Sequence, residues 1–305
     1  MALAFDFAGR GGIEFGVGLR EDRGGTFVLI PVAQGLHATL FELAETTWNN
    51  ANALGSAPAL YEPAEKHGNI EYLYSPIQDP LVTRFRLLHE AENLSVDAAI
   101  LNTPEAFDCY FVRAVDTSGQ RLTAVKRATQ FKGVLKQHLI RFLDDSFHLV
   151  TEPTFRLDND FDVLVDDETV HVYRPISFEL LGSMQEAIMS RVPENVATLR
   201  AELTYVSFDS LEAYAQEHPR AARCIASIRT LGEVKDVDKG ALKRTCAEND
   251  VDVVEKKGML HVQQGHELGF LEVLDRRRYI LELVKGQPEA YRANSRTKLV
   301  KGKKQ

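Results

Sequence analysis

The sequence has few cysteines and no long apolar run. Its three cysteines, Cys109, Cys224 and Cys246, are odd in number and far apart, so they form neither a disulfide framework nor the paired CxxC ligands of a zinc site. This usage favours a reducing compartment. The longest apolar segments, such as residues 27–33, fall well short of the roughly 18 residues that span a bilayer, and Asp6 interrupts the apolar start, unlike a signal peptide. We therefore expect a soluble, cytoplasmic protein that reaches a membrane only through a partner.

The sequence also lacks the spacings of common catalytic and nucleotide-binding motifs. Its early glycines fit neither GxGxxG nor a P-loop and are typical of strands and turns. The histidines are isolated or, like His261 and His266, five residues apart, which does not match HExxH. No serine lies in a GxSxG turn, and Cys109, inside an expected strand, is predicted to be a buried and inert thiol. We therefore predict no catalytic residues and no cofactor.

Charge is distributed unevenly along the chain. As a bulk number, the net charge of −8 argues against non-specific nucleic-acid binding. Residues 1–110 carry 6 Lys/Arg against 15 Asp/Glu, whereas residues 113–141 carry 7 basic side chains against Asp116 alone, and residues 276–305 carry 10 against two glutamates. Two basic segments therefore stand in an otherwise acidic chain.

The size and the hydrophobic pattern predict an α+β fold. A length of 305 residues permits one large domain or two, and 44% apolar with 26% charged residues is ordinary for a globular protein. The periodicity predicts an N-terminal hairpin and helix module, a central antiparallel β-meander, and a helical C-terminal part with a small hairpin. We place a domain boundary after residue 105, with the N-terminal α+β module over 1–105 and a second domain over 106–305.

The expected elements follow from the spacing of the apolar residues. The first module contains a hairpin over 13–32 and helices over 36–52 and 81–94. The meander, 107–175, contains strands 107–116, 120–128, 138–143, 146–151, 161–166 and 169–174, with a short helix at 131–137. The helical part, 176–290, contains helices 178–189, 196–203, 211–217, 221–231, 239–248, 267–274 and 279–284 and a hairpin around 251–262. A basic tail, 291–305, follows.

The densest acidic cluster is LDNDFDVLVDDETVHV, which begins at residue 157. On an extended strand Asp158, Asp160 and Asp162 would share one face, where carboxylates can hold the divalent ion of a nuclease. Side chains two residues apart lie almost 7 Å from each other along a strand, about 3.4 Å per residue, so one ion would need further ligands. We therefore favour a solvated hairpin face and no metal site, and keep a metal-dependent nuclease as an alternative.

The two basic segments are the candidate nucleic-acid-binding residues, because several phosphate contacts require a local excess of positive charge. The candidates are Arg276, Arg277, Arg278, Arg292, Arg296, Lys298 and Lys301 near the C-terminus, and Lys126, Arg127, Lys132 and Lys136 in the middle. Solvated strand and helix faces would explain the middle segment equally. A solubilising tail, or an arm that docks on an acidic surface, would explain the C-terminal one. We rank the C-terminal segment first, because a meander would pack the 158–168 acids against the middle segment.

Two stretches of the sequence resemble the KwaB-like family, which provides the cytosolic component of the bacterial Kiwa anti-phage defence system. One is FRLDNDFDVLVDDETVHVYRPISFE at 155–179. The other, FLEVLDRRRYILELVKGQPEAYRANSRTKLV at 270–300, resembles the family's closing pattern of a leucine-rich helix, a short loop and then Tyr-x-Ala-x-Ser-Lys. Tyr291, Ala293 and Ser295 occupy those places, and Arg296 replaces the Lys while keeping its charge. The resemblance covers roughly residues 107–300.

This resemblance implies a DNA-binding protein that acts with a separate membrane-embedded partner, KwaA, and that assembles as a homodimer. It brings no catalytic residues with it. Our first hypothesis is therefore a non-enzymatic effector of phage defence that binds duplex DNA and is recruited to the inner membrane through its partner. A metal-dependent nuclease that uses the 158–162 aspartates, and a protein-interaction adaptor with a basic docking tail, remain the alternatives.

Overall fold

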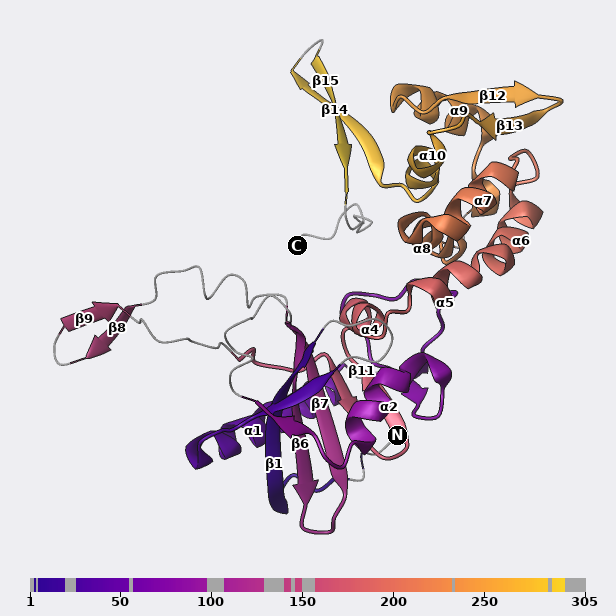
Figure 1. Cartoon of the computed structure of the whole chain (residues 1–305). Helices are drawn as coiled ribbons and strands as arrows, with labels where there is room; N and C mark the ends of the chain where they lie inside the picture. Colours follow the sequence, from indigo (N-terminus) through magenta and orange to yellow (C-terminus); the bar gives the residue numbers. More distant parts are fainter. Residues whose placement is uncertain are drawn as a thin grey trace. The chain divides into compact units, whose positions relative to one another are not determined.

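The computed structural model describes residues 3, 5–19, 26–54, 57–97, 107–128, 140–143, 146–149, 157–231, 234–284 and 287–293. The chain divides into two compact units: unit 1, Met1–Tyr61 with His67–Met184, and unit 2, Glu62–Lys66 with Gln185–Gln305. Unit 1 is built on a sheet and unit 2 mainly on helices (Figure 1). The predicted α+β class is confirmed.

Unit 1 contains a nine-stranded, mostly antiparallel sheet. In sheet order its strands are β3 (Ala59–Leu60), β4 (Leu73–Pro76), β11 (Thr169–Val172), β10 (Val163–Val165), β7 (Arg121–Arg127), β6 (Phe107–Asp116), β1 (Arg10–Leu19), β2 (Phe27–Ile30) and β5 (Ser95–Val96). The two-residue strands β3 and β5 end the sheet as parallel additions. Such short edges offer little backbone to another strand.

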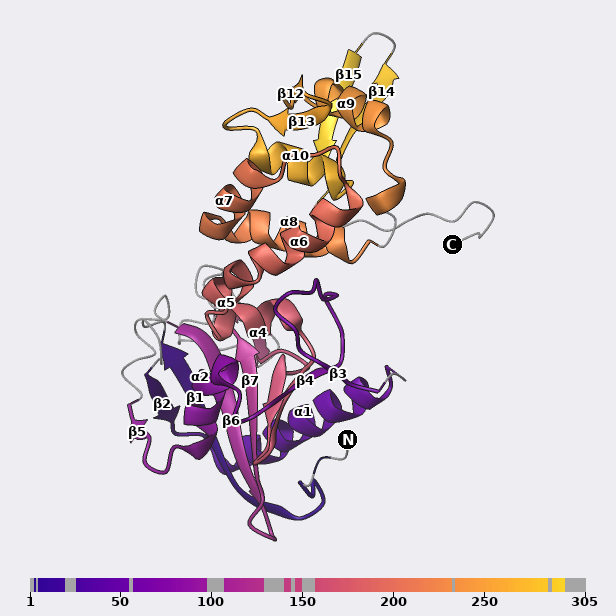
Figure 2. The same cartoon turned by 90° about the vertical axis from the view of Figure 1, so that its right-hand side faces the viewer.

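Helices cover both faces of this sheet. They are α1 (Gln34–Asn52), the 3₁₀ turn η1 (Pro80–Val82), α2 (Thr83–Glu90) and α4 (Pro175–Leu181). The long helix α1 lies on one face and α2 with α4 on the other (Figure 2). Side chains of β6 alternate between the faces, so Tyr110 and Val112 join the core under α1. Their neighbours Cys109 and Phe111 are buried as well, which fits a central strand covered on both sides.

The predicted meander is confirmed for four strands. Strands β6, β7, β10 and β11 are sheet neighbours in chain order and pair antiparallel. Strands β8 (Ile140–Leu143) and β9 (Ser146–Leu149), which we expected in the same meander, pair with each other in a separate two-stranded sheet. The predicted short helix at 131–137 lies outside the described residues. The register that sets Val163 opposite Val125 brings the acidic segment that precedes β10 next to Lys126.

Unit 2 contains short helices and two hairpins. Its elements are α5 (Gln185–Ser190), α6 (Val192–Glu202), α7 (Asp209–Glu217), α8 (Pro219–Arg229), η4 (Val234–Asp236), α9 (Lys239–Glu248), β12 (Val253–Lys256), β13 (Met259–Val262), α10 (Glu267–Leu274), β14 (Arg278–Val284) and β15 (Gln287–Arg292). Helix α8 packs against α5, α6, α7 and α10. Its Ala221, Ala222 and Ala226 are buried, and such small side chains let the neighbouring helices approach closely.

One predicted element of unit 2 is wrong in type. Residues 279–284, expected to be helical, form most of strand β14, and β15 begins within the helical part and extends into the expected basic tail. The run Tyr279-Ile-Leu-Glu-Leu-Val fits both the 3.6-residue period of a helix and the two-residue period of a strand. Its pairing with Gln287–Arg292 decides in favour of a strand. The single helix expected over 178–189 is divided into α4 and α5 around Ser183, whose φ is 53°.

The compact units do not divide the chain where we placed the domain boundary. Strand β1, from the expected N-terminal module, pairs with β6 of the expected second domain, and the units separate after Met184. Residues 98–106 lie outside the described part of the chain. A division at 105/106 stays a prediction about domain organisation.

Candidate nucleic-acid interface

Three of the predicted arginines stand where helix α10 ends. Asp275 caps the helix, and Arg276 follows with a left-handed backbone, φ 56°. The Arg276 amide donates to the Val273 carbonyl at 2.9 Å, and the Arg277 amide donates to the Glu272 carbonyl at 2.8 Å. This pair of bonds is a Schellman motif, which stops a helix and turns the chain. It leads the chain from α10 through the arginines directly into β14.

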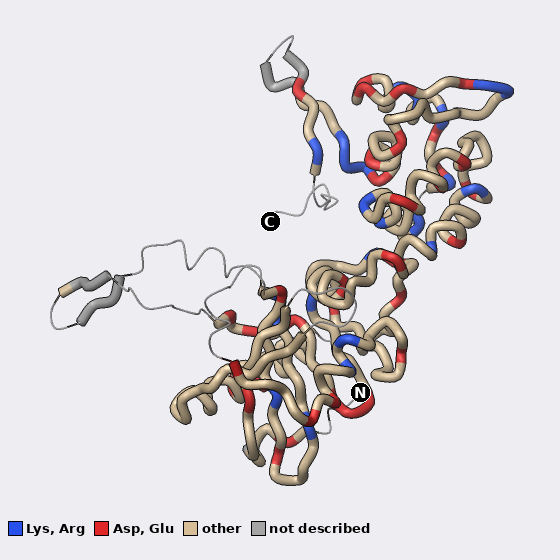
Figure 3. Tube along the Cα trace, in the orientation of Figure 1, with Lys and Arg blue, Asp and Glu red and all other residues tan. Residues whose placement is uncertain are grey.

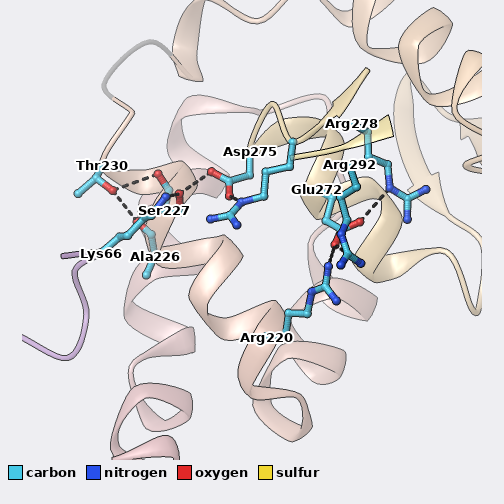
Figure 4. Close-up of polar contacts among 10 residues, drawn as sticks. Lys66, Arg220, Ala226, Ser227, Thr230, Glu272, Asp275, Arg278 and Arg292 are labelled. Atoms are coloured by element: carbon cyan, nitrogen blue, oxygen red, sulfur yellow. Dashed lines mark hydrogen bonds and ion pairs between the residues drawn. The ribbon is translucent and has the colours of Figure 1, made fainter. Parts of the chain in front are cut away.

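Glu272 gathers arginines from three segments of unit 2 (Figure 4). Its side chain is only 1% exposed, and a buried carboxylate needs charged partners. The Arg278 Nε donates to Oε2 at 2.9 Å, and Arg220, from the first turn of α8, donates to Oε1. An Arg292 Nη1 from β15 lies 3.9 Å from Oε1. Gly269 gives room for this arrangement, because an added Cβ would lie 3.3 Å from the Arg278 guanidinium carbon.

Asp275 is the second buried carboxylate of this region. It accepts hydrogen bonds from Arg277 and, at 2.5 Å, from the Ser227 hydroxyl on α8. The Lys66 Nζ lies 3.1 Å from the same Ser227 Oγ. Segment Glu62–Lys66, which belongs to unit 2, is thereby attached to the arginine-rich region (Figure 4).

We name Arg220, Arg276, Arg277, Arg278 and Arg292 the arginine cluster. Four of these guanidinium groups stand beside two buried carboxylates, and Arg276 is an exposed fifth arginine next to them in the chain, so the local balance is positive. The cluster also reaches solvent, because the side chains of Arg220 and Arg292 are 50% and 48% exposed. The segment that joins α10 to β14 is a blue stretch in Figure 3. Neutralising Glu272, Asp275 and the carboxyl end of α10 accounts for part of this charge but leaves a surplus.

The middle basic segment has a different environment. Lys126, on β7 in unit 1, lies 2.8 Å from Asp160 and 2.9 Å from Asp162, and Asp160 also pairs with Arg174. Burial opposes the charge of Lys126, but the attraction of Asp162 and Asp160 outweighs it and raises the Lys126 pKa. Asp160 is likewise partly buried, yet hydrogen bonds from Lys126 and Arg174 lower its pKa. Acids therefore neutralise Lys126, whereas Arg127 meets Asp162 through its backbone amide.

The three aspartates that suggested a metal site are occupied by protein groups. They do not lie on one strand, since β10 begins only at Val163. Asp158 accepts from the Tyr110 hydroxyl at 3.3 Å, and Asp162 accepts from the Arg127 amide at 2.9 Å. Among the residues that the structure describes, no group of three or more His, Cys, Asp and Glu side chains is arranged to hold a metal ion. The geometry is that of an ion-paired turn.

The remaining predicted candidates fall outside the description. Arg296, Lys298, Lys301, Lys132 and Lys136 lie outside the described residues. Conversely, sequence reasoning missed Arg220 and Lys66. They lie 52 and 161 residues along the chain from their partners Glu272 and Ser227, and only the packing of unit 2 brings them together. The one available signal was Pro219-Arg220 at an expected helix start.

The cysteines are unsuited to nucleophilic chemistry. Cys109, Cys224 and Cys246 are all buried. Burial raises the pKa of the Cys224 thiol to about 11 and that of Cys246 to about 12, and it raises the pKa of Cys109 further still. At neutral pH these thiols are protonated, as expected for inert core residues. Within the described part of the chain, no helix combines the length and apolar character needed to traverse a bilayer.

Comparison with known proteins gives one result. Neither the curated proteins nor the solved structures compared with the chain gave a match. A family model described as Kiwa protein KwaB-like matches residues 105–265. The match includes the 155–179 stretch that suggested this family and ends before the 270–300 stretch. Because it covers 161 of 305 residues, the chain belongs to the KwaB-like family of the Kiwa anti-phage defence system.

Proposed function

We propose that the protein binds DNA through the arginine cluster, with little sequence preference and without catalysis of its own. The observation that carries this proposal is the surplus of guanidinium groups over carboxylates at a partly exposed corner of unit 2. Neutralising phosphates is the main source of non-specific affinity for DNA. The sequence lacks the paired Cys and His spacing of a zinc finger, which supports contact with the DNA backbone rather than with base edges.

The buried carboxylates contribute to this function by positioning the arginines. Glu272 holds Arg278 at 2.9 Å while Arg220 and Arg292 approach its other oxygen. A guanidinium has five N–H donors in a fixed fork, so one or two bonds to Glu272 leave donors for a phosphate. Side chains that are already ordered lose less conformational entropy on binding. The cluster is thus a prepared surface for an anion rather than a set of independent flexible charges.

The non-enzymatic part of the proposal rests on the aspartates. Metal-assisted cleavage of DNA requires carboxylates that converge on an ion. Asp160 and Asp162 instead converge on Lys126, at 2.8 and 2.9 Å. We therefore expect no cleavage of duplex DNA in magnesium or manganese.

The family suggests the partners. We propose that the protein forms a homodimer in the cytoplasm and acts with a membrane-embedded protein of the KwaA type, which recruits it to the inner membrane. A light-scattering mass near 34.2 kDa, that of a single chain, at micromolar concentration would contradict the dimer.

The deciding experiment is a titration of duplex DNA at several salt concentrations, with and without magnesium. If about five phosphates are neutralised, log affinity should fall with log salt at a slope of about −4.5. Arg220→Gln should flatten the slope by about 0.9 and keep the fold, because Arg278 and Arg292 still accompany Glu272. Arg200→Gln is the matched control. Arg200 is another arginine of unit 2, its side chain is 45% exposed, and it forms ion pairs with Asp209 and Glu212.

Each result bears on one hypothesis. No binding at low salt would refute DNA binding and favour the adaptor. Nicking that requires magnesium would favour the nuclease. If Arg220→Gln and Arg200→Gln changed the salt slope and the DNA affinity equally, the arginine cluster would not be the DNA interface.

A further inference from the structure

The hairpin of β14 and β15 has two chemically different faces. Arg278 pairs with Arg292 across the strands, and both turn toward Glu272. Tyr279 pairs with Tyr291 on the opposite face, followed by Leu281 opposite Glu289. Tyr279, Leu281 and Tyr291 are 43%, 41% and 40% exposed. Two-stranded ribbons are only marginally stable alone. An exposed aromatic face on such a ribbon therefore indicates a surface that binds a partner.

The two tyrosine rings form a short column. Their centroids are 5.8 Å apart and their planes differ by only 18°. The Tyr291 hydroxyl donates to the Glu289 carboxylate, which fixes the orientation of that ring. Two nearly parallel rings stacked side by side leave an outer ring face at each end of the column. Flat π-systems add to such faces by stacking.

Charge identifies the class of molecule that suits this face. Residues 276–293 carry five Lys/Arg and two Glu. A second copy of the same ribbon would bring like charges together, which opposes self-association at this surface. Glu289, exposed on the tyrosine face itself, opposes insertion into a bilayer because a carboxylate is costly to bury in hydrocarbon. A polyanion that also presents flat rings satisfies both the arginines and the tyrosines.

We propose that single-stranded DNA is the preferred ligand of this hairpin, with bases stacked on Tyr279 and Tyr291 and phosphates held by the arginine cluster. Duplex DNA keeps its bases stacked within the helix, so it can use the arginines but not the tyrosine column. Base stacking on aromatic side chains is sequence-tolerant, because every base has a π-face. This inference rests on the proposed DNA binding and adds the form of DNA.

The test compares three ligands of equal length: a single-stranded oligonucleotide, an abasic oligonucleotide with the same phosphates, and a duplex. Tyr279→Ala with Tyr291→Ala should weaken binding of the single strand by about 30-fold or more, since stacking contributes about 1–3 kcal/mol per base and the variant loses the stacking of two bases. The abasic strand and the duplex should bind this variant as they bind the wild type. Tyr279→Phe with Tyr291→Phe should restore the single-strand affinity, because the ring and not the hydroxyl is used.

The other hairpin of unit 2 provides the control. Val254 and Met259 on β12 and β13 are 38% and 37% exposed, and Val254→Ala with Met259→Ala should leave all three affinities unchanged. A wild type that binds none of the ligands would refute the proposed function and this inference together. Binding of all three with no effect of the tyrosine variants would refute the inference alone, as would an equal loss on the abasic strand. The tyrosine variants could instead change the oligomeric mass in light scattering, or the binding to vesicles, while the affinity for single-stranded DNA stays the same. That result would refute the inference and identify a different partner for the tyrosine face.

Discussion

The two compact units both contain basic side chains bound to carboxylates, but in opposite proportion. Unit 1 carries 14 Lys/Arg against 24 Asp/Glu, a balance of −10, and unit 2 carries 22 against 20, a balance of +2. In unit 1, Lys126 stands between two aspartates. In unit 2, three arginines approach one buried carboxylate, that of Glu272.

This difference shows that a count of basic residues along a segment does not measure its power to bind phosphate. The relevant quantity is the number of cations that remain after nearby acids have been neutralised, because charges within a Debye length of about 8–10 Å act together. Residues 113–141 have a sequence excess of +6, yet Lys126 belongs to an acidic neighbourhood. The arginine cluster keeps its excess because its acids are fewer and buried.

The largest expected effect comes from removing several cluster charges at once. Arg220→Gln, Arg276→Gly and Arg292→Gln together leave Arg278 on Glu272 and Arg277 on Asp275. Three lost phosphate contacts should flatten the salt slope by about 2.7 and lower duplex affinity about 500-fold at 0.1 M salt, with no difference near 1 M. Lys126→Gln with Arg127→Gln should cost far less. If this pair abolished binding and the triple variant did not, the interface would lie in unit 1.

A pH titration separates the units by a second property. His89 in unit 1 is buried between the Thr123 hydroxyl at 2.9 Å and the Asp167 carboxylate at 3.1 Å. Burial is the main cause that lowers the His89 pKa, against the raising effect of Asp167. Below the unfolded pKa of about 6.5 the unfolded chain therefore binds a proton that the folded unit does not, and stability falls by up to about 1.4 kcal/mol per pH unit.

The single tryptophan provides the measurement. Trp48 lies in unit 1, so its fluorescence reports unfolding of that unit between pH 7 and 5. DNA binding by the arginine cluster should not change over this range for the native protein, because guanidinium groups stay charged. His89→Asn should remove the dependence of the unfolding free energy on pH in this window, even where it lowers stability overall. If the pH dependence persisted in His89→Asn, the titration would belong to another group.

The sequence predicted the fold better than the site, for a physical reason. Strand β6 and helix α10 were predicted with the bounds observed, because their apolar periods and flanking turn residues are local signals. β14 was assigned to the wrong type because its apolar run fits two periods, and only the pairing with β15 distinguishes them. Only part of the arginine cluster was predicted. Arg276, Arg277 and Arg278 are consecutive in the sequence, whereas Arg220 reaches the cluster only through the packing of α8 on α10.

A smaller effect is expected for Arg276→Gly alone. Arg276 occupies the left-handed position of the Schellman motif, which glycine adopts without steric cost. The substitution should therefore keep or raise the melting temperature while it flattens the salt slope by about 0.9 and lowers affinity about eightfold at 0.1 M salt. Arg276→Lys, which keeps the charge, is the control. An unchanged slope would show that Arg276 does not contact phosphate.

The smallest expected effect tests unit 1 from the opposite direction, by removing an acid instead of a base. Asp160→Asn takes one of two carboxylates from Lys126 and leaves Asp162 at 2.9 Å. Because Asp162 still holds the ammonium and salt screens the rest, duplex affinity should rise only about two- to threefold. Asp209→Asn, which removes an exposed acid from Arg200 in unit 2, controls for the change in net charge. A rise as large as the loss in the triple variant would mean that Lys126 is a masked phosphate contact. If instead Asp160→Asn abolished a magnesium-dependent nicking activity of the wild type, the ion-paired aspartates would have to rearrange around a metal, and unit 1 would be the catalytic part of the molecule.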